Sequence, residues 1–105
     1  MTLATVIVAP RARRDLAALY DYLNAYSVEL AEYHVTRLEN QIEGLADPLV
    51  TWSFFSITGA PYRAKLFSVG RRTKFWIVYR ERPDLNEVHV LRIWNASRDL
   101  EDFSI

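Results

Sequence analysis

Basic side chains gather in one short stretch of this chain, between residues 62 and 82. They are Arg63, Lys65, Arg71, Arg72, Lys74, Arg80 and Arg82. Glu81 is the only acidic residue among them. Guanidinium and ammonium groups bind phosphates and other anions through charge-assisted hydrogen bonds. The stretch is therefore a candidate surface for an anionic partner, and the alternative is an ordinary solvated strand face rich in Lys and Arg.

The composition of the whole chain limits the classes of function. Its 13 Lys and Arg balance 13 Asp and Glu, which argues against binding nucleic acid by bulk charge. A length of 105 residues predicts a single domain, residues 1–105. The absence of cysteine excludes disulfides, thiolate metal sites and thiol nucleophiles. With three glycines and no Gly-rich turn, a phosphate-binding loop is excluded too.

The periodicity of apolar residues predicts two helices after a short N-terminal strand at residues 2–8. Pro10 suits the first turn of a helix, and an apolar stripe runs from Ala12 to Leu23. Ser27 is a good N-cap for a second helix, which Asp47 and Pro48 end. Because the two helices are joined so tightly, they are expected to form an antiparallel hairpin.

The second half of the chain predicts a three-strand antiparallel meander. Alternating patterns cover residues 62–69, 73–80 and 87–94, with turn residues at Gly70 and at 83–86. Residues 49–61 fit either a loop or a short strand. The fold class is therefore α+β, with the helical hairpin on one face of the sheet. The opposite face is expected to be open, and the alternation of basic residues in the middle strands places them there.

Three stretches together resemble the RelE/ParE superfamily of toxins from bacterial type II toxin–antitoxin modules. The first is PRARRDLAALYDYL, which begins at Pro10 and contains Asp15. The second is YRAKLFSV followed by FWIVYR, and the third is VLRIWNASRDLEDF. The resemblance covers most of the chain in the same order. The ending from Asn95 to Asp99 is similar to the ParE-like branch more than to the nuclease branch.

This resemblance implies a ParE-like toxin that inhibits growth by binding a cellular target such as DNA gyrase. A cognate antitoxin would neutralise it, with a toxin–antitoxin hetero-oligomer as the expected assembly. The alternative is a RelE-like, ribosome-dependent endoribonuclease that cleaves mRNA. A third reading is a decayed member that retains antitoxin binding alone. The expected location is the cytoplasm, because no run of residues is apolar enough for a membrane helix, and no cofactor or metal is expected.

The resemblance also assigns candidate site residues. As a nuclease, the chain would use Arg63, Lys65 and Arg98 to relieve phosphate charge. Three departures leave the enzymatic reading open: Trp76, Asn95 and Phe103 stand where nuclease relatives have an arginine, a histidine and a tyrosine. The candidate target-binding residues are Arg63, Lys65, Arg72, Lys74, Arg92 and Arg98.

The remaining candidates for proton transfer are two histidines and two lysines. His34 is expected on the solvated flank of the second helix, and His89 at the edge of the core. Lys65 or Lys74 would serve as a base only if its pKa fell by several units from about 10.4. The general acid and base of a nuclease are therefore not evident in the sequence.

Overall fold

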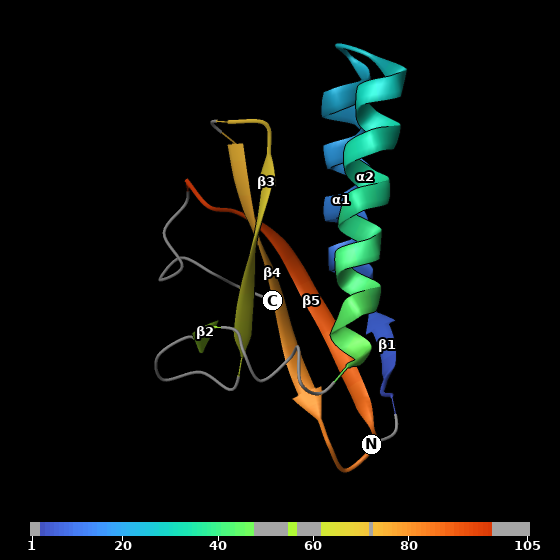
Figure 1. Cartoon of the computed structure of the whole chain (residues 1–105), viewed down its shortest axis with the longest axis vertical. Coiled ribbons are helices and arrows are strands. Elements are labelled where there is room, and N and C mark those ends of the chain that lie inside the picture. The colour runs from blue at the N-terminus through green and yellow to red at the C-terminus, as the bar shows by residue number, and fades with distance from the viewer. Residues whose placement is uncertain (1–2, 48–54, 57–61, 72, 98–105) are drawn as a thin grey trace.

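A computed structural model describes residues 3–47, 55–56, 62–71 and 73–97 (Figure 1). Its elements in chain order are β1 (Thr5–Val8), α1 (Pro10–Asn24), α2 (Val28–Glu43), the 3₁₀ turn η1 (Gly44–Ala46), β2 (Phe55–Ser56), β3 (Arg63–Val69), β4 (Thr73–Arg82) and β5 (Glu87–Asn95). The predicted α+β class and the predicted helical hairpin are confirmed. A short strand, β2, lies within the ambiguous segment 49–61, whose other residues lie outside the described part.

The strands form one sheet in the order β1-β5-β4-β3-β2. Strands β2 to β5 pair antiparallel, which confirms the meander. The N-terminal strand β1 pairs in parallel with β5, so the helical hairpin forms the long connection that a parallel pair requires. Both helices lie on one side of the sheet, close to β1 and β5 (Figure 1).

Local sequence signals account for the ends of the helices. Pro10 occupies the first turn of α1, where its missing N–H breaks no hydrogen bond. Ser27 caps α2, because its Oγ accepts a hydrogen bond from the backbone N–H of Leu30 at 3.2 Å. Between β3 and β4, Gly70 adopts a φ of 70°, a left-handed conformation that glycine tolerates without strain.

The main core lies between the helices and the sheet. It includes the predicted apolar stripes of both helices, with Ala12 and Leu38 fully buried. On the sheet, Ile77 and Tyr79 of β4 belong to the same cluster and are also fully buried. Since side chains alternate between the two faces of a strand, this cluster identifies the face of the sheet that the helices cover.

The opposite face of the sheet carries a second buried cluster and is not simply open as expected. Ala64, Val78 and Trp94 form this cluster, with Tyr62 and Trp76 packed against it. Trp94 is only 3% exposed. The expectation of an open cationic face is therefore wrong for the centre of the sheet, because buried apolar side chains occupy it.

A β-bulge changes which face of the sheet the side chains of β5 occupy. The register with β4 shifts between Val78 and Tyr79, so that Val78 faces Arg92 while Tyr79 faces Val90. The extra residue on β5 reverses the alternation beyond it, because two residues there oppose one on β4. The prediction that side chains alternate simply along residues 87–94 is therefore wrong for the second half of β5.

No helix in the described part of the chain is long and apolar enough to cross a membrane.

Candidate functional site

Arg63 and Lys65 lie side by side on β3, on the face of the sheet that carries the main core. Arg63 pairs in register with Tyr79, and Lys65 pairs with Ile77. Directly opposite residues of an antiparallel pair share a face, so both cations point to the side of the helices. The prediction that they lie on the opposite face is wrong. Phe67 and Val69 of the same strand belong to the main core, and residues two apart on a strand share a face, so Arg63 and Lys65 lie on that face too.

Arg63 is held by an ion pair with Glu81 of the neighbouring strand. Its Nε lies 2.8 Å from Oε1 of Glu81, and the two side chains are 28% and 23% exposed. Tyr79, the cross-strand partner of Arg63, is fully buried. Burial raises the pKa of Tyr79 to about 12, with Arg63 acting to lower it and Glu81 to raise it. The half-buried guanidinium is thus oriented by a carboxylate beside a neutral phenol.

Lys65 is half-buried, and its burial lowers the pKa of its ammonium group below the ordinary value. Desolvation disfavours the charged form of an amine, which explains the direction. Arg63 and Lys65 are the two predicted site residues that the described structure brings together. Side by side, they can contribute positive charge to an anion or to an acidic side chain of a partner.

The other described cations of the predicted site lie elsewhere. Lys74 pairs with Ser68 and is exposed on the face opposite Arg63 and Lys65. Arg92 is 9% exposed, and its Nε donates to Oδ2 of Asp15 on α1 at 2.8 Å. Arg92 is therefore a buried cation paired with Asp15, and its role in target binding stays a prediction. Arg72 and Arg98 lie outside the described residues.

His34 is buried within the helical layer, so its prediction as a solvated side chain is wrong. It is 8% exposed, and its Nδ1 lies 3.3 Å from Nη1 of Arg37. Burial, followed by the charge of Arg37, lowers the pKa of His34. The ring of Tyr33 meets the imidazole edge-on at 5.1 Å. This environment favours a neutral imidazole that accepts a hydrogen bond from Arg37.

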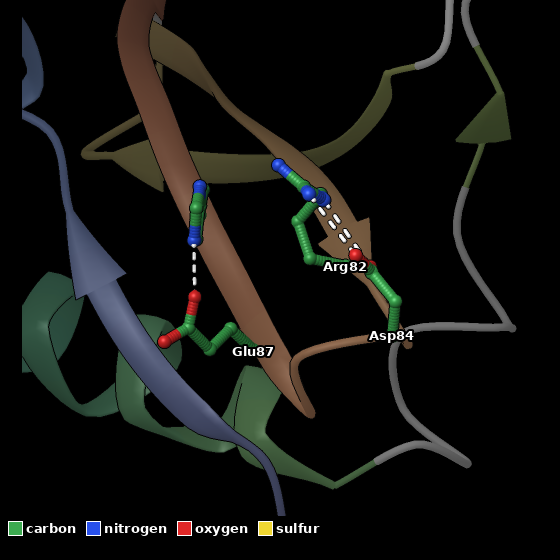
Figure 2. Close-up of polar contacts among 4 residues, drawn as sticks. Arg82, Asp84 and Glu87 are labelled. Carbon is green, nitrogen blue, oxygen red and sulfur yellow. Dashed lines mark hydrogen bonds and ion pairs between the residues drawn. The ribbon is translucent and has the colours of Figure 1, made fainter.

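His89 is half-buried near the start of β5 and contacts Glu87. Its Nε2 lies 2.9 Å from Oε1 of Glu87. At the neighbouring hairpin turn, Arg82 donates from Nε and Nη2 to the two carboxylate oxygens of Asp84 at 3.3 and 3.1 Å. Figure 2 shows Glu87 and the Arg82–Asp84 pair on the two sides of this hairpin. Each histidine thus has its own polar partner, Arg37 for His34 and Glu87 for His89.

Two surface grooves flank β1 and β5, and the sequence did not indicate either of them. A groove of about 410 Å³ lies between α1 and the end of β5, with Asp15, Tyr22, Phe75 and Trp94 among its lining residues. A second groove of about 440 Å³ follows β1 beneath the two helices. The described residues hold no cluster of three or more metal-ligating side chains.

Comparisons with known proteins identify the family. The model of the ParE toxin family, ParE toxin of type II toxin-antitoxin system, parDE, matches residues 6–100. No curated protein matches significantly. A solved structure of the chromosomal ParDE system from P. aeruginosa matches with a TM-score of 0.70 and 21% identity, over 89% of this chain and 96% of that chain.

A second solved structure, a metal-bound toxin from Helicobacter pylori, matches with a TM-score of 0.41 and 16% identity. It covers 96% of this chain and 100% of that chain, but a TM-score this low supports no argument about this protein. The P. aeruginosa structure supports the same fold. Together with the family match over almost the whole chain, the observations show that this chain belongs to the ParE family of toxins of type II toxin–antitoxin systems.

Proposed function

We propose that this protein inhibits bacterial growth by binding a cellular target, with DNA gyrase as the expected target, and that a cognate antitoxin neutralises it in the cytoplasm. The match of the ParE toxin family over residues 6–100 carries this proposal. The arrangement of the cations supports binding over cleavage. Arg63 and Lys65 share one face, Lys74 lies on the other, and Arg92 is paired with Asp15. Phosphodiester cleavage needs such groups converged on one phosphate.

In this proposal Arg63 and Lys65 form the centre of the target-binding surface. Glu81 orients the guanidinium of Arg63, and the partial burial of both side chains lowers the entropy that they lose on binding. Arg72 and Arg98 complete the candidate set, whereas Lys74 lies on the opposite face of the sheet and Arg92 would contribute only after leaving Asp15.

One observation favours ribosome-dependent mRNA cleavage as the second candidate function. The lowered pKa of Lys65 brings its amine closer to the range of a general base. In that reaction Lys65 would take the proton of a 2′-hydroxyl as its oxygen attacks the adjacent phosphorus. Arg63 would stabilise the phosphate charge, and the 5′-oxygen would leave with a proton from water.

Induction of the protein in bacteria separates the two functions. A gyrase-binding toxin is expected to cause DNA breaks and an SOS response while translation continues. A ribonuclease is expected to stop translation within minutes and to cut transcripts. In either case Arg63→Ala should relieve growth inhibition, whereas Arg14→Ala, an exposed cation on α1, should not. Unaffected growth with soluble wild-type protein would refute both functions.

A further inference from the structure

The far end of the helical hairpin, residues 21–33, carries exposed aromatic and apolar side chains. Nine large hydrophobic side chains are exposed in the described part of the chain, and five of them lie within this helical tip. The five are Tyr22, Tyr26, Val28, Leu30 and Tyr33, with exposed fractions of 58%, 72%, 48%, 38% and 60%. The rings of Tyr22 and Tyr26 meet edge-on at 5.7 Å. Exposed apolar side chains concentrated in this way indicate an interaction surface, and tyrosine is enriched in protein–protein interfaces.

The same helical tip is acidic. Residues 16–36 contain three acidic side chains and no lysine or arginine. The three acids, Asp21, Glu29 and Glu32, are exposed. Glu29 accepts a hydrogen bond from the hydroxyl of Ser27 at 3.0 Å, whereas Asp21 and Glu32 form no ion pair with another described residue. The tip therefore suits a partner surface that combines apolar area with positive charge.

This chain itself carries such a surface, at the turn between β3 and β4. Arg71 in the turn and Lys74 near the start of β4 are exposed. Neither of them forms an ion pair with another described residue. Leu66 of β3 is 43% exposed and lies on the same face of the sheet as Lys74. The β3–β4 turn thus has the charge and the apolar area that complement the helical tip.

The helical tip and the β3–β4 turn lie at the same end of the molecule. Figure 1 shows the helical hairpin projecting beyond this turn at the upper end of the view. Arg37 of α2 donates to the carbonyl of Ser68 at 3.4 Å, and α2 extends a further 14 Å or about nine residues from Arg37 to its start at Val28. The groove of about 410 Å³ separates the two surfaces, with Tyr22 and Thr73 among its lining residues.

We propose that two copies of this chain associate through this end, with the helical tip of each copy against the β3–β4 turn of the other. Because both surfaces lie at one end, a two-fold axis forms both contacts at once, and the interface closes as a dimer. Tyr22 and Tyr26 supply apolar contact area, and Asp21 and Glu32 lie opposite Arg71 of the partner subunit. This association is independent of the proposed function, since it depends on the surface of the chain alone.

Exchange of charges between the two surfaces tests the association. The tip variant carries Asp21→Lys with Glu32→Lys, and the turn variant carries Arg71→Glu. Each variant alone should self-associate at least about tenfold more weakly than the wild-type protein, because like charges then meet at both contacts. An equimolar mixture of the two variants should recover the affinity, because opposite charges again meet at both contacts. Sedimentation equilibrium at high micromolar concentration measures the association constants.

Two further variants control for net charge and for apolar contact. Glu39→Lys with Glu43→Lys makes the same change in charge toward the other end of α2 and should leave self-association unchanged. Tyr26→Ser removes the most exposed ring of the tip and should weaken self-association about tenfold. Circular dichroism checks that each variant keeps its helices. Self-association of the wild-type protein should also be weaker in about 1 M than in about 0.1 M sodium chloride.

The outcomes that would overturn the dimer are distinct. A wild-type protein that stays monomeric at its highest soluble concentration would refute the association. A mixture of the tip and turn variants that associates no more tightly than either alone would refute the pairing of tip with turn. Assemblies larger than a dimer would refute the two-fold arrangement, because they require copies joined head to tail. None of these results bears on growth inhibition, so the proposed function is tested separately.

Discussion

The carboxylate of Asp15 on α1 and the guanidinium of Arg92 on β5 form an ion pair of 2.8 Å across 77 residues of sequence. The same carboxylate accepts the backbone N–H of Ile93 at 2.9 Å. Strand β1 ends at Val8, opposite Val90, so β5 continues beyond its parallel neighbour. Asp15 thus accepts the outward N–H of Ile93, which lies beyond the end of β1. It thereby links the segment that begins at Pro10 to the C-terminal segment that contains Arg92.

Loss of Asp15 is expected to destabilise the fold strongly. Asp15→Ala removes the acceptor of the Ile93 N–H and the carboxylate that pairs with the buried Arg92 guanidinium, which should cost about 2–3 kcal/mol. Asp15→Asn keeps one oxygen acceptor and should cost about 1 kcal/mol. Urea unfolding followed by circular dichroism measures both. Asp21→Ala, an exposed position on the same helix, should change stability by less than about 0.5 kcal/mol; equal losses at the two aspartates would contradict this role.

The N-cap of α2 gives a smaller, local effect. Ser27→Ala removes the acceptor for the N–H of Leu30 and the hydroxyl that donates to Glu29 at 3.0 Å. The expected loss is about 1 kcal/mol in the free energy of unfolding. Ser27→Asn retains a capping oxygen and should recover most of it. Thermal unfolding compares the two variants, and identical melting temperatures would show that the cap does not contribute.

Acid is expected to weaken the fold through His34. Burial and the charge of Arg37 lower its pKa in the folded state, so the unfolded chain binds a proton more readily. The stabilising contribution is complete above the unfolded pKa of about 6.5, and it is lost as the pH falls from that value through the lower pKa of the folded state. Chemical unfolding between pH 7.5 and 5.5 measures the loss. His34→Gln should flatten this part of the profile, and an unchanged slope would exclude His34 as its source.

Alkali is expected to act through Tyr79. Burial raises its pKa to about 12, whereas an unfolded tyrosine ionises near pH 10. The neutral phenol is favoured in the fold, so stability is retained below about pH 10 and falls as the pH rises toward 12. Ultraviolet absorbance of tyrosinate should show a late-titrating group that is absent in Tyr79→Phe. A variant with the same titration curve as wild type would contradict the assignment.

Much of the architecture was predictable because its signals are local. Pro10 and Ser27 mark helix starts, and the apolar stripes of both helices are buried as the periodicity indicates. The alternating segments became β3, β4 and β5 with bounds close to those expected. The family resemblance also followed from residues in the sequence, and the family match confirms it.

The candidate site was less predictable, because its decisive contacts join distant segments. Arg63 and Lys65 were singled out by their charge, but their face follows from pairing with β4. His34 is buried beside Arg37, whose guanidinium reaches across to the carbonyl of Ser68 on β3, 31 residues further along the chain.

By itself, the sequence determined the elements, their order, the capping residues and the family, since each depends on neighbours a few residues apart. The tertiary structure alone decided the parallel pairing of β1 with β5, the bulge in β5 and the ion pair of Arg92 with Asp15. These features depend on strand register and on contacts between segments far apart in the chain. A shift of one residue in register exchanges the faces of a strand without changing its sequence pattern.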